Sequence, residues 1–153
     1  MTERGTESGF TLLETVCVLA IIAMLAAIAL PAFPRGTSRP ALEAYVLKTA
    51  ALLKGDRIAA IRKATVVQTQ LSMLSGTIRS GANGLVVQLP SDVTFNAIIA
   101  GQCGGHASGR AIEFLPSGMS CGGTIFLSRP GTAYEIRVTW LTGGVEVVPA
   151  NAL

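Results

Sequence analysis

The 153-residue chain has little charge and few of the side chains that enzymes use. Only 14% of its residues are charged, against about 25% in an average soluble domain. Its carboxylates are scattered singly, which excludes a paired-carboxylate glycosidase site and an EF-hand calcium loop. Its glycine pairs lack the spacing of a Walker A or dinucleotide motif and are typical of turns. We therefore predict that the chain is not an enzyme and has no cofactor or small-molecule substrate.

The single histidine, His106, is a weak candidate for catalysis or metal binding. It lies in the glycine-rich stretch 101–109, for which we expect a mobile surface loop. A serine or cysteine nucleophile would need it as a base, and no second titratable partner accompanies it. Cys103 and Cys121 could join His106 around zinc. Because three ligands without Cys-x-x-Cys spacing are a weak zinc signal, we predict no metal site.

The cysteines are odd in number, since the chain has three. Cys17 lies inside an apolar run, which leaves Cys103 and Cys121 as a candidate disulfide in an oxidising compartment. Their bond would close a loop of roughly 19 residues and stabilise the fold by about 3 kcal/mol in the chain-entropy model. The sequence alone leaves open whether this disulfide forms.

Basic residues are in slight excess, with a net charge of +3, and no five of them are adjacent. A basic nucleic-acid-binding tail is therefore not indicated. Four basic residues, Lys54, Arg57, Arg62 and Lys63, nevertheless lie in one stretch. We interpret them as a solvated helix face. DNA binding is the alternative, although no aromatic side chains accompany them as a base-stacking platform.

One long segment is almost wholly apolar. Residues 15–34 include no charged residue, and Phe10–Phe33 has the length of a membrane-spanning helix, about 20 residues. A cleaved secretory signal would begin with a basic leader, whereas this leader contains two glutamates and one arginine. A buried core helix is the bland alternative, but a helix that is apolar on all sides does not suit the core of so small a protein. A membrane-spanning helix is the interpretation that remains.

Glu14 lies inside this apolar block, where a carboxylate at mid-membrane costs about 2.5–3.5 kcal/mol or more. One interpretation is an interfacial glutamate that marks the start of the span. The other is that its carboxylate pairs with a cationic group of a neighbouring helix in a bundle.

The residues around Glu14 resemble a known processing signal. The hexapeptide Gly-Phe-Thr-Leu-Leu-Glu at positions 9–14, before a membrane-length apolar run, is similar to the signal of type IV prepilins and type II secretion pseudopilins. The resemblance implies that prepilin peptidase cuts after Gly9 and methylates the new N-terminal Phe10. It also implies that the amine of Phe10 pairs with Glu14 of a neighbouring subunit in a filament.

The resemblance also implies how the chain is organised. Residues 1–9 would be the leader peptide, 10–34 the transmembrane and filament-core helix, and 35–153 a periplasmic domain. The protein would cross the bacterial inner membrane once. Its implied partners are other pseudopilins, prepilin peptidase and the inner-membrane assembly platform. Charge counting alone gives the reverse orientation, because basic residues follow the apolar run; we follow the motif.

A second resemblance lies near the C-terminus. Residues 112–118, 122–125, 136–138 and 144–145 are similar to the GspH/FimT pseudopilin domain. This implies a minor pseudopilin near the tip of a type II secretion pseudopilus. The alternative is a FimT-like minor pilin of a type IV pilus, with DNA as a further partner.

Periodicity predicts an α+β fold after residue 35. Apolar residues at helical spacing predict a helix that begins near Ser38 or Arg39, has Pro40 in its first turn, and ends near Lys63. Alternation and turn signals then predict strands near residues 65–71, 85–89, 111–115, 124–128, 133–140 and 145–148. Short connections favour antiparallel pairing. The pilin resemblance implies the same plan: a long N-terminal helix, half in the membrane, packed on an antiparallel sheet.

Overall fold

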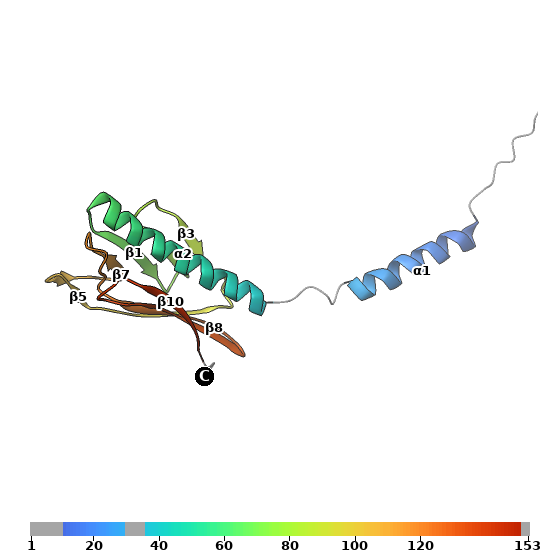
Figure 1. Ribbon diagram of the computed structural model, residues 1–153. Coiled ribbons are helices and arrows are strands. Elements are labelled where there is room, and N and C mark those ends of the chain that lie inside the picture. The colour runs from blue at the N-terminus through green and yellow to red at the C-terminus, as the bar shows by residue number, and fades with distance from the viewer. Residues whose placement is uncertain (1–10, 30–35, 151–153) are drawn as a thin grey trace, which may run out of the picture. The chain divides into compact units, whose positions relative to one another are not determined.

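The structure is a computed structural model that describes residues 11–29 and 36–150. The chain divides into two compact units, residues 1–35 and 36–153. The first contains the helix α1 (Leu12–Ala29), and the second contains the longer helix α2 (Arg39–Lys63) and the described strands (Figure 1). The predicted span 10–34 extends beyond the described residues at both ends. Within the described residues, no helix is both long enough and apolar enough to cross a membrane.

The helix α2 begins and ends as the sequence predicts. Ser38 is the N-cap, and its side-chain hydroxyl accepts a hydrogen bond from the Ala41 backbone N–H at 3.3 Å. Pro40 occupies the first turn, where its missing N–H costs nothing. The helix ends at Lys63, and Ala64 is its C-cap, whose φ of 51° is left-handed and whose N–H bonds back to the last turn. Gly55 lies within the helix and does not interrupt it.

Two four-stranded antiparallel sheets form the rest of the second unit. Sheet A has the order β3-β2-β1-β7, sheet B has the order β10-β9-β8-β4, and β5 and β6 form a separate hairpin. The strands are β1 (Val67–Ser72), β2 (Thr77–Arg79), β3 (Val86–Gln88), β4 (Thr94–Ile99), β5 (Gln102–Cys103), β6 (His106–Ala107), β7 (Ala111–Phe114), β8 (Gly123–Arg129), β9 (Thr132–Val138) and β10 (Val145–Ala150).

The core lies between α2 and the two sheets, because α2 contacts strands of both (Figure 1). The buried face of α2 repeats at helical spacing and consists of Leu42, Val46, Thr49, Ala50, Leu53, Asp56 and Ala60. The sheets contribute large, fully buried apolar side chains, namely Ile78, Ile112, Phe114, Ile125, Leu127 and Ile136. The α+β class is therefore confirmed, with a helix packed on antiparallel sheets.

All six predicted strands are present, and four others were missed. The strand β4 is not predicted from the sequence, because only Phe95 of its residues is buried and the alternation of apolar and polar residues is weak. The stretch 101–109, expected to be a mobile loop, instead contains the β5–β6 hairpin. The predicted strand 133–140 is two residues shorter than expected, because β9 ends at Val138, and Trp140 beyond it is 62% exposed.

Candidate functional site

The start of α1 places Glu14 in the first turn of the helix. Its backbone N–H donates to the Thr11 hydroxyl at 3.3 Å and to the Thr11 carbonyl at 3.0 Å. A threonine three residues before a glutamate has the spacing of a capping box, and the helix dipole favours a carboxylate at this end. Thr11 therefore caps the start of α1 through the backbone N–H of Glu14, and the Glu14 carboxylate lies at the helix end that favours an anion. Gly9 and Phe10 lie outside the described residues.

Glu14 is the sole charged residue of α1, and the helix is otherwise almost entirely apolar. The large exposed apolar side chains of α1 are Leu12, Leu13, Val16, Val18, Leu19, Ile21, Ile22, Met24 and Leu25. They do not leave one polar face, as an amphipathic surface helix would. Taken by itself, α1 therefore presents a helix suited to an apolar environment with a carboxylate at one end.

In the second unit, Asp56 of α2 is a buried hydrogen-bond acceptor for the turn after β2. It is 1% exposed. Its carboxylate accepts from the hydroxyls of Thr69, at 2.6 Å, and Ser80. It also accepts from the backbone N–H groups of Gly81, at 3.2 Å, and Ala82, at 3.3 Å. One side chain thus ties α2 to sheet A and to the segment that leads into β3.

The turn can pack closely against the backbone of β1 because residue 81 is glycine. A Cβ at Gly81 would lie 2.3 Å from the backbone oxygen of Gln68, which real structures do not tolerate. The adjoining Ala82 carbonyl accepts a hydrogen bond from the Lys63 ammonium at 3.2 Å. The end of α2 is therefore joined to the same turn.

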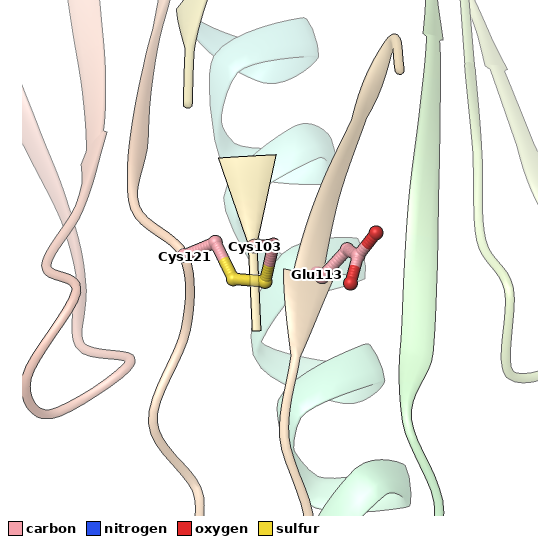
Figure 2. Close-up of side chains that lie close together, drawn as sticks. All are labelled: Cys103, Glu113 and Cys121. Carbon is pink, nitrogen blue, oxygen red and sulfur yellow. A yellow bond between two sulfur atoms is a disulfide. The ribbon is translucent and has the colours of Figure 1, made fainter. Parts of the chain in front are cut away.

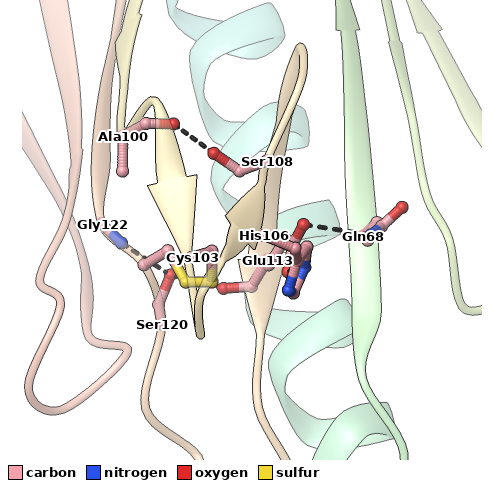
Figure 3. The surroundings of a disulfide bond; sticks show 9 residues. Gln68, Ala100, Cys103, His106, Ser108, Glu113, Ser120 and Gly122 are labelled. Atoms are coloured by element: carbon pink, nitrogen blue, oxygen red, sulfur yellow. Dashed lines mark hydrogen bonds and ion pairs between the residues drawn. A yellow bond between two sulfur atoms is a disulfide. The ribbon is translucent and has the colours of Figure 1, made fainter.

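A second polar cluster lies beside the β5–β6 hairpin. The structure joins Cys103 and Cys121 by a disulfide, with their Cα atoms 5.6 Å apart, within the usual range (Figure 2). Glu113 of β7 is 0% exposed and lies next to the sulfur atoms (Figure 2). Its carboxylate accepts from the Gln68 side-chain amide at 3.0 Å and contacts His106 Nε2 at 3.1 Å (Figure 3). The histidine expected to lack a titratable partner therefore has one.

Reduction of the Cys103–Cys121 bond is expected to lower the free energy of unfolding by about 3 kcal/mol, because the unfolded chain regains the entropy of the open loop. Guanidinium titration of the full-length chain in detergent, with and without reductant, measures the difference. A Cys17→Ser background removes the remaining thiol. Mass spectrometry after alkylation that finds both thiols free in untreated protein would contradict the bond.

The basic stretch on α2 does not form one free surface. Arg57 Nε donates to the backbone carbonyls of Gly118 and Thr142, both at 3.0 Å, and so joins two turns of the domain. Lys54, Arg62 and Lys63 are exposed, and the Lys63 ammonium is bonded to a backbone carbonyl. The interpretation as a wholly solvated face is wrong for Arg57, which has a structural role.

A surface contact holds the segment before α2. The Asp92 carboxylate accepts from the backbone N–H of Thr37 and from its hydroxyl, the latter at 2.8 Å. The backbone bond and then the side-chain bond hold the pKa of Asp92 below its usual value. The contribution of this contact to stability is present above the ordinary carboxyl pKa and is lost as the pH falls through the lowered one.

Sequence reasoning singled out the cysteines and His106 but missed Glu113 and Asp56. The signal for Asp56 was present, because it lies three residues after Leu53 on the periodic apolar face of α2. Glu113 lies between two buried apolar residues, so strand alternation predicts an exposed side chain. The β5–β6 hairpin covers that side, and it was not predicted.

Comparison with known proteins adds two findings. Residues 4–30 match the model of the prokaryotic N-terminal methylation motif. The chain is similar in structure to the minor pseudopilin EpsH of the Vibrio cholerae type 2 secretion system, at TM-score 0.54 and 8% identity, covering 74% of this chain and 98% of that one. It is similar to the type IV minor pilin FimU of Pseudomonas aeruginosa, at TM-score 0.53 and 14% identity, covering 74% and 92%.

The chain therefore has a type IV pilin-like fold, of the kind found in minor pseudopilins and minor pilins. It carries an N-terminal methylation motif ahead of that fold. Together, these two features support the resemblance to GspH/FimT-type minor pseudopilins that the sequence suggested.

Proposed function

We propose that this protein is a minor pseudopilin, a non-enzymatic subunit of a type II secretion pseudopilus that supports protein export across the outer membrane. One observation carries the proposal: a methylation motif at residues 4–30 precedes a globular pilin-like domain. Such a chain supplies a helix for a filament core and a folded head for its surface. The compared structures are those of a pseudopilin and a pilin, and neither is an enzyme.

Processing would begin at the inner membrane, where prepilin peptidase cuts between Gly9 and Phe10 and methylates the new amine. A glycine before the cut leaves the peptide bond unshielded, so a protease can approach the backbone closely. The mature chain would remain anchored by residues 10–34, with residues 35–153 in the periplasm. The motif match and the apolar character of α1 support this arrangement. The assembly platform and other pseudopilins would be its partners.

Glu14 would direct insertion into the filament. Cleavage creates a cationic amine at Phe10, and an unpaired charge is costly in an apolar surrounding. The Glu14 carboxylate of one subunit could cancel the amine of the next, which makes one register favourable. Support comes from the position of Glu14 as the sole charge on an otherwise apolar helix. The cap at Thr11 is compatible with pairing, because it uses the backbone N–H of Glu14 and not the carboxylate.

A minor pilin of a type IV pilus is the second candidate, and the likeness to FimU favours it about as strongly as EpsH favours the first. The basic stretch on α2 gives little support to a minor pilin that binds DNA. Lys54, Arg62 and Lys63 are exposed there, and Lys63 is bonded to a backbone carbonyl, as is the half-buried Arg57. Nonspecific binding to DNA depends on several phosphate contacts.

Deletion of the gene is expected to stop export of secreted enzymes into the medium while surface pili remain, because a secretion filament that lacks a minor subunit assembles poorly. Secreted activity and pilus abundance measure the two outcomes, and restoration of the gene is the control. Loss of pili with normal export would instead favour the type IV pilus.

A further inference from the structure

Three metal-binding side chains converge beside the β5–β6 hairpin. One ligand atom each from Cys103, Glu113 and Cys121 lies within 4.8 Å of the others (Figure 2). Glu113 and Cys103 are buried, and Cys121 is half-buried. A buried carboxylate next to two sulfur atoms is not required by the core, because an apolar side chain would fill the space without a desolvation cost.

His106 brings a fourth donor to the cluster. Its Nε2 lies 3.1 Å from a carboxylate oxygen of Glu113 (Figure 3). It is the direct cross-strand partner of Cys103 in the hairpin. Such partners project from the same face of a pair of strands. The side chain is 56% exposed, so its ring can adjust its position.

Backbone hydrogen bonds hold these donors in place independently of the sulfur–sulfur bond. The Cys121 N–H donates to the Glu113 carbonyl at 3.1 Å, and Ser120 bridges to Phe114 at the end of β7. The β5–β6 pairing holds the other two donors together. The Gln68 amide fixes one oxygen of the carboxylate, as outer groups orient metal ligands.

We propose that, when Cys103 and Cys121 are reduced, they bind a divalent metal ion of the zinc class together with Glu113 and His106. Two thiolates, one imidazole and one carboxylate are a donor set that tetrahedral zinc accepts. The metal would offset the negative charges that two thiolates add to a buried carboxylate. From the sequence we considered three of these donors and predicted no metal site, and the fold adds Glu113 as the fourth donor.

The metal and the disulfide exclude each other, since both use the same sulfur atoms. Binding of the ion by the two thiols forms two metal–sulfur bonds and releases two protons. A disulfide oxidant releases the metal. The oxidant accepts two electrons and becomes two thiolates, while the sulfur atoms of Cys103 and Cys121 bond to each other and the metal–sulfur bonds break. The hairpin would be cross-linked to the segment after β7 in either state.

Cobalt titration of the reduced, full-length chain in detergent tests the proposal. A Cys17→Ser background removes the other cysteine. We expect one cobalt ion per chain, with the thiolate-to-cobalt charge-transfer and visible bands of tetrahedral coordination. Zinc should displace the cobalt, and glutathione disulfide should release it as the Cys103–Cys121 bond forms. The oxidised chain should show none of these bands.

Matched variants identify the ligands. Glu113→Gln is expected to weaken cobalt binding about tenfold or more, and Cys103→Ser with Cys121→Ser should abolish the charge-transfer band. Glu146→Gln, an exposed carboxylate on β10, is the control and should change nothing. Circular dichroism follows folding in every sample. The proposal is wrong if the reduced chain binds no cobalt, whether it is folded or unfolded. It is also wrong if the double-serine variant binds cobalt as tightly as the reduced chain with both cysteines.

Discussion

A protein in which alanine replaces Glu14 is expected to be cut between Gly9 and Phe10 as usual and to enter filaments at least about tenfold less often. Removing one partner of a buried ion pair leaves the other charge uncompensated, which costs about 3–5 kcal/mol. Cleavage should be unaffected, because the peptidase acts at the Gly9–Phe10 bond. The amount of the subunit in sheared filaments, relative to its amount in membranes, measures the effect.

Two further variants separate charge pairing from helix capping. Glu14→Gln keeps the length of the side chain and the backbone bond to Thr11 but removes the charge, so it should behave like the alanine variant. Thr11→Val removes the capping hydroxyl and keeps the charge, and it should be incorporated almost normally. Normal incorporation of Glu14→Gln would refute the pairing role, and failure of Thr11→Val alone would show that helix capping, not the charge, controls incorporation.

Asp56→Ala is expected to destabilise the globular unit by about 3–5 kcal/mol. The substitution leaves the Thr69 and Ser80 hydroxyls and two backbone N–H groups of the following turn without their acceptor. An unsatisfied buried donor costs about 1–3 kcal/mol, and these donors share one carboxylate, so their costs do not simply add. Guanidinium denaturation of the full-length chain in detergent measures the change.

Thr49→Val is the matched control for Asp56→Ala. Thr49 is also fully buried on α2, but its hydroxyl has no hydrogen-bond partner among the described residues. Its replacement by an apolar side chain of the same shape should be neutral or slightly stabilising. A loss at Thr49 as large as that at Asp56 would show that the helix face tolerates no change, and the role of the Asp56 carboxylate would be unproven.

The helical part of the fold could be read from the sequence because its signals are local. Ser38 and Pro40 mark the start of α2, and an apolar residue every three or four positions predicts which face is buried. The six predicted strands were recognisable for the same reason. The strand β4 carries a weak local pattern and pairs with β8, which is distant in sequence. The strands β5 and β6 have two residues each, too few to show an alternation.

The buried polar clusters were less predictable. Cys103 and Cys121 were a candidate pair from the sequence, but the placement of Glu113 against them depends on a hairpin that alternation does not predict. Arg57 looked like part of a solvated face, and the turns that accept its hydrogen bonds lie more than sixty residues away (sequence separations of 61 and 85). Contacts between distant segments leave no periodic pattern at either end.

The processing of the N-terminus tests the account most directly. The protein should be isolated from the membranes of cells with a working prepilin peptidase, and its N-terminal fragment identified by mass spectrometry. The account predicts a chain that begins at Phe10 with a methylated amine. A chain that still begins at Met1 would lack the cation that Glu14 is proposed to neutralise, and it would contradict the assignment as a pilin-type subunit.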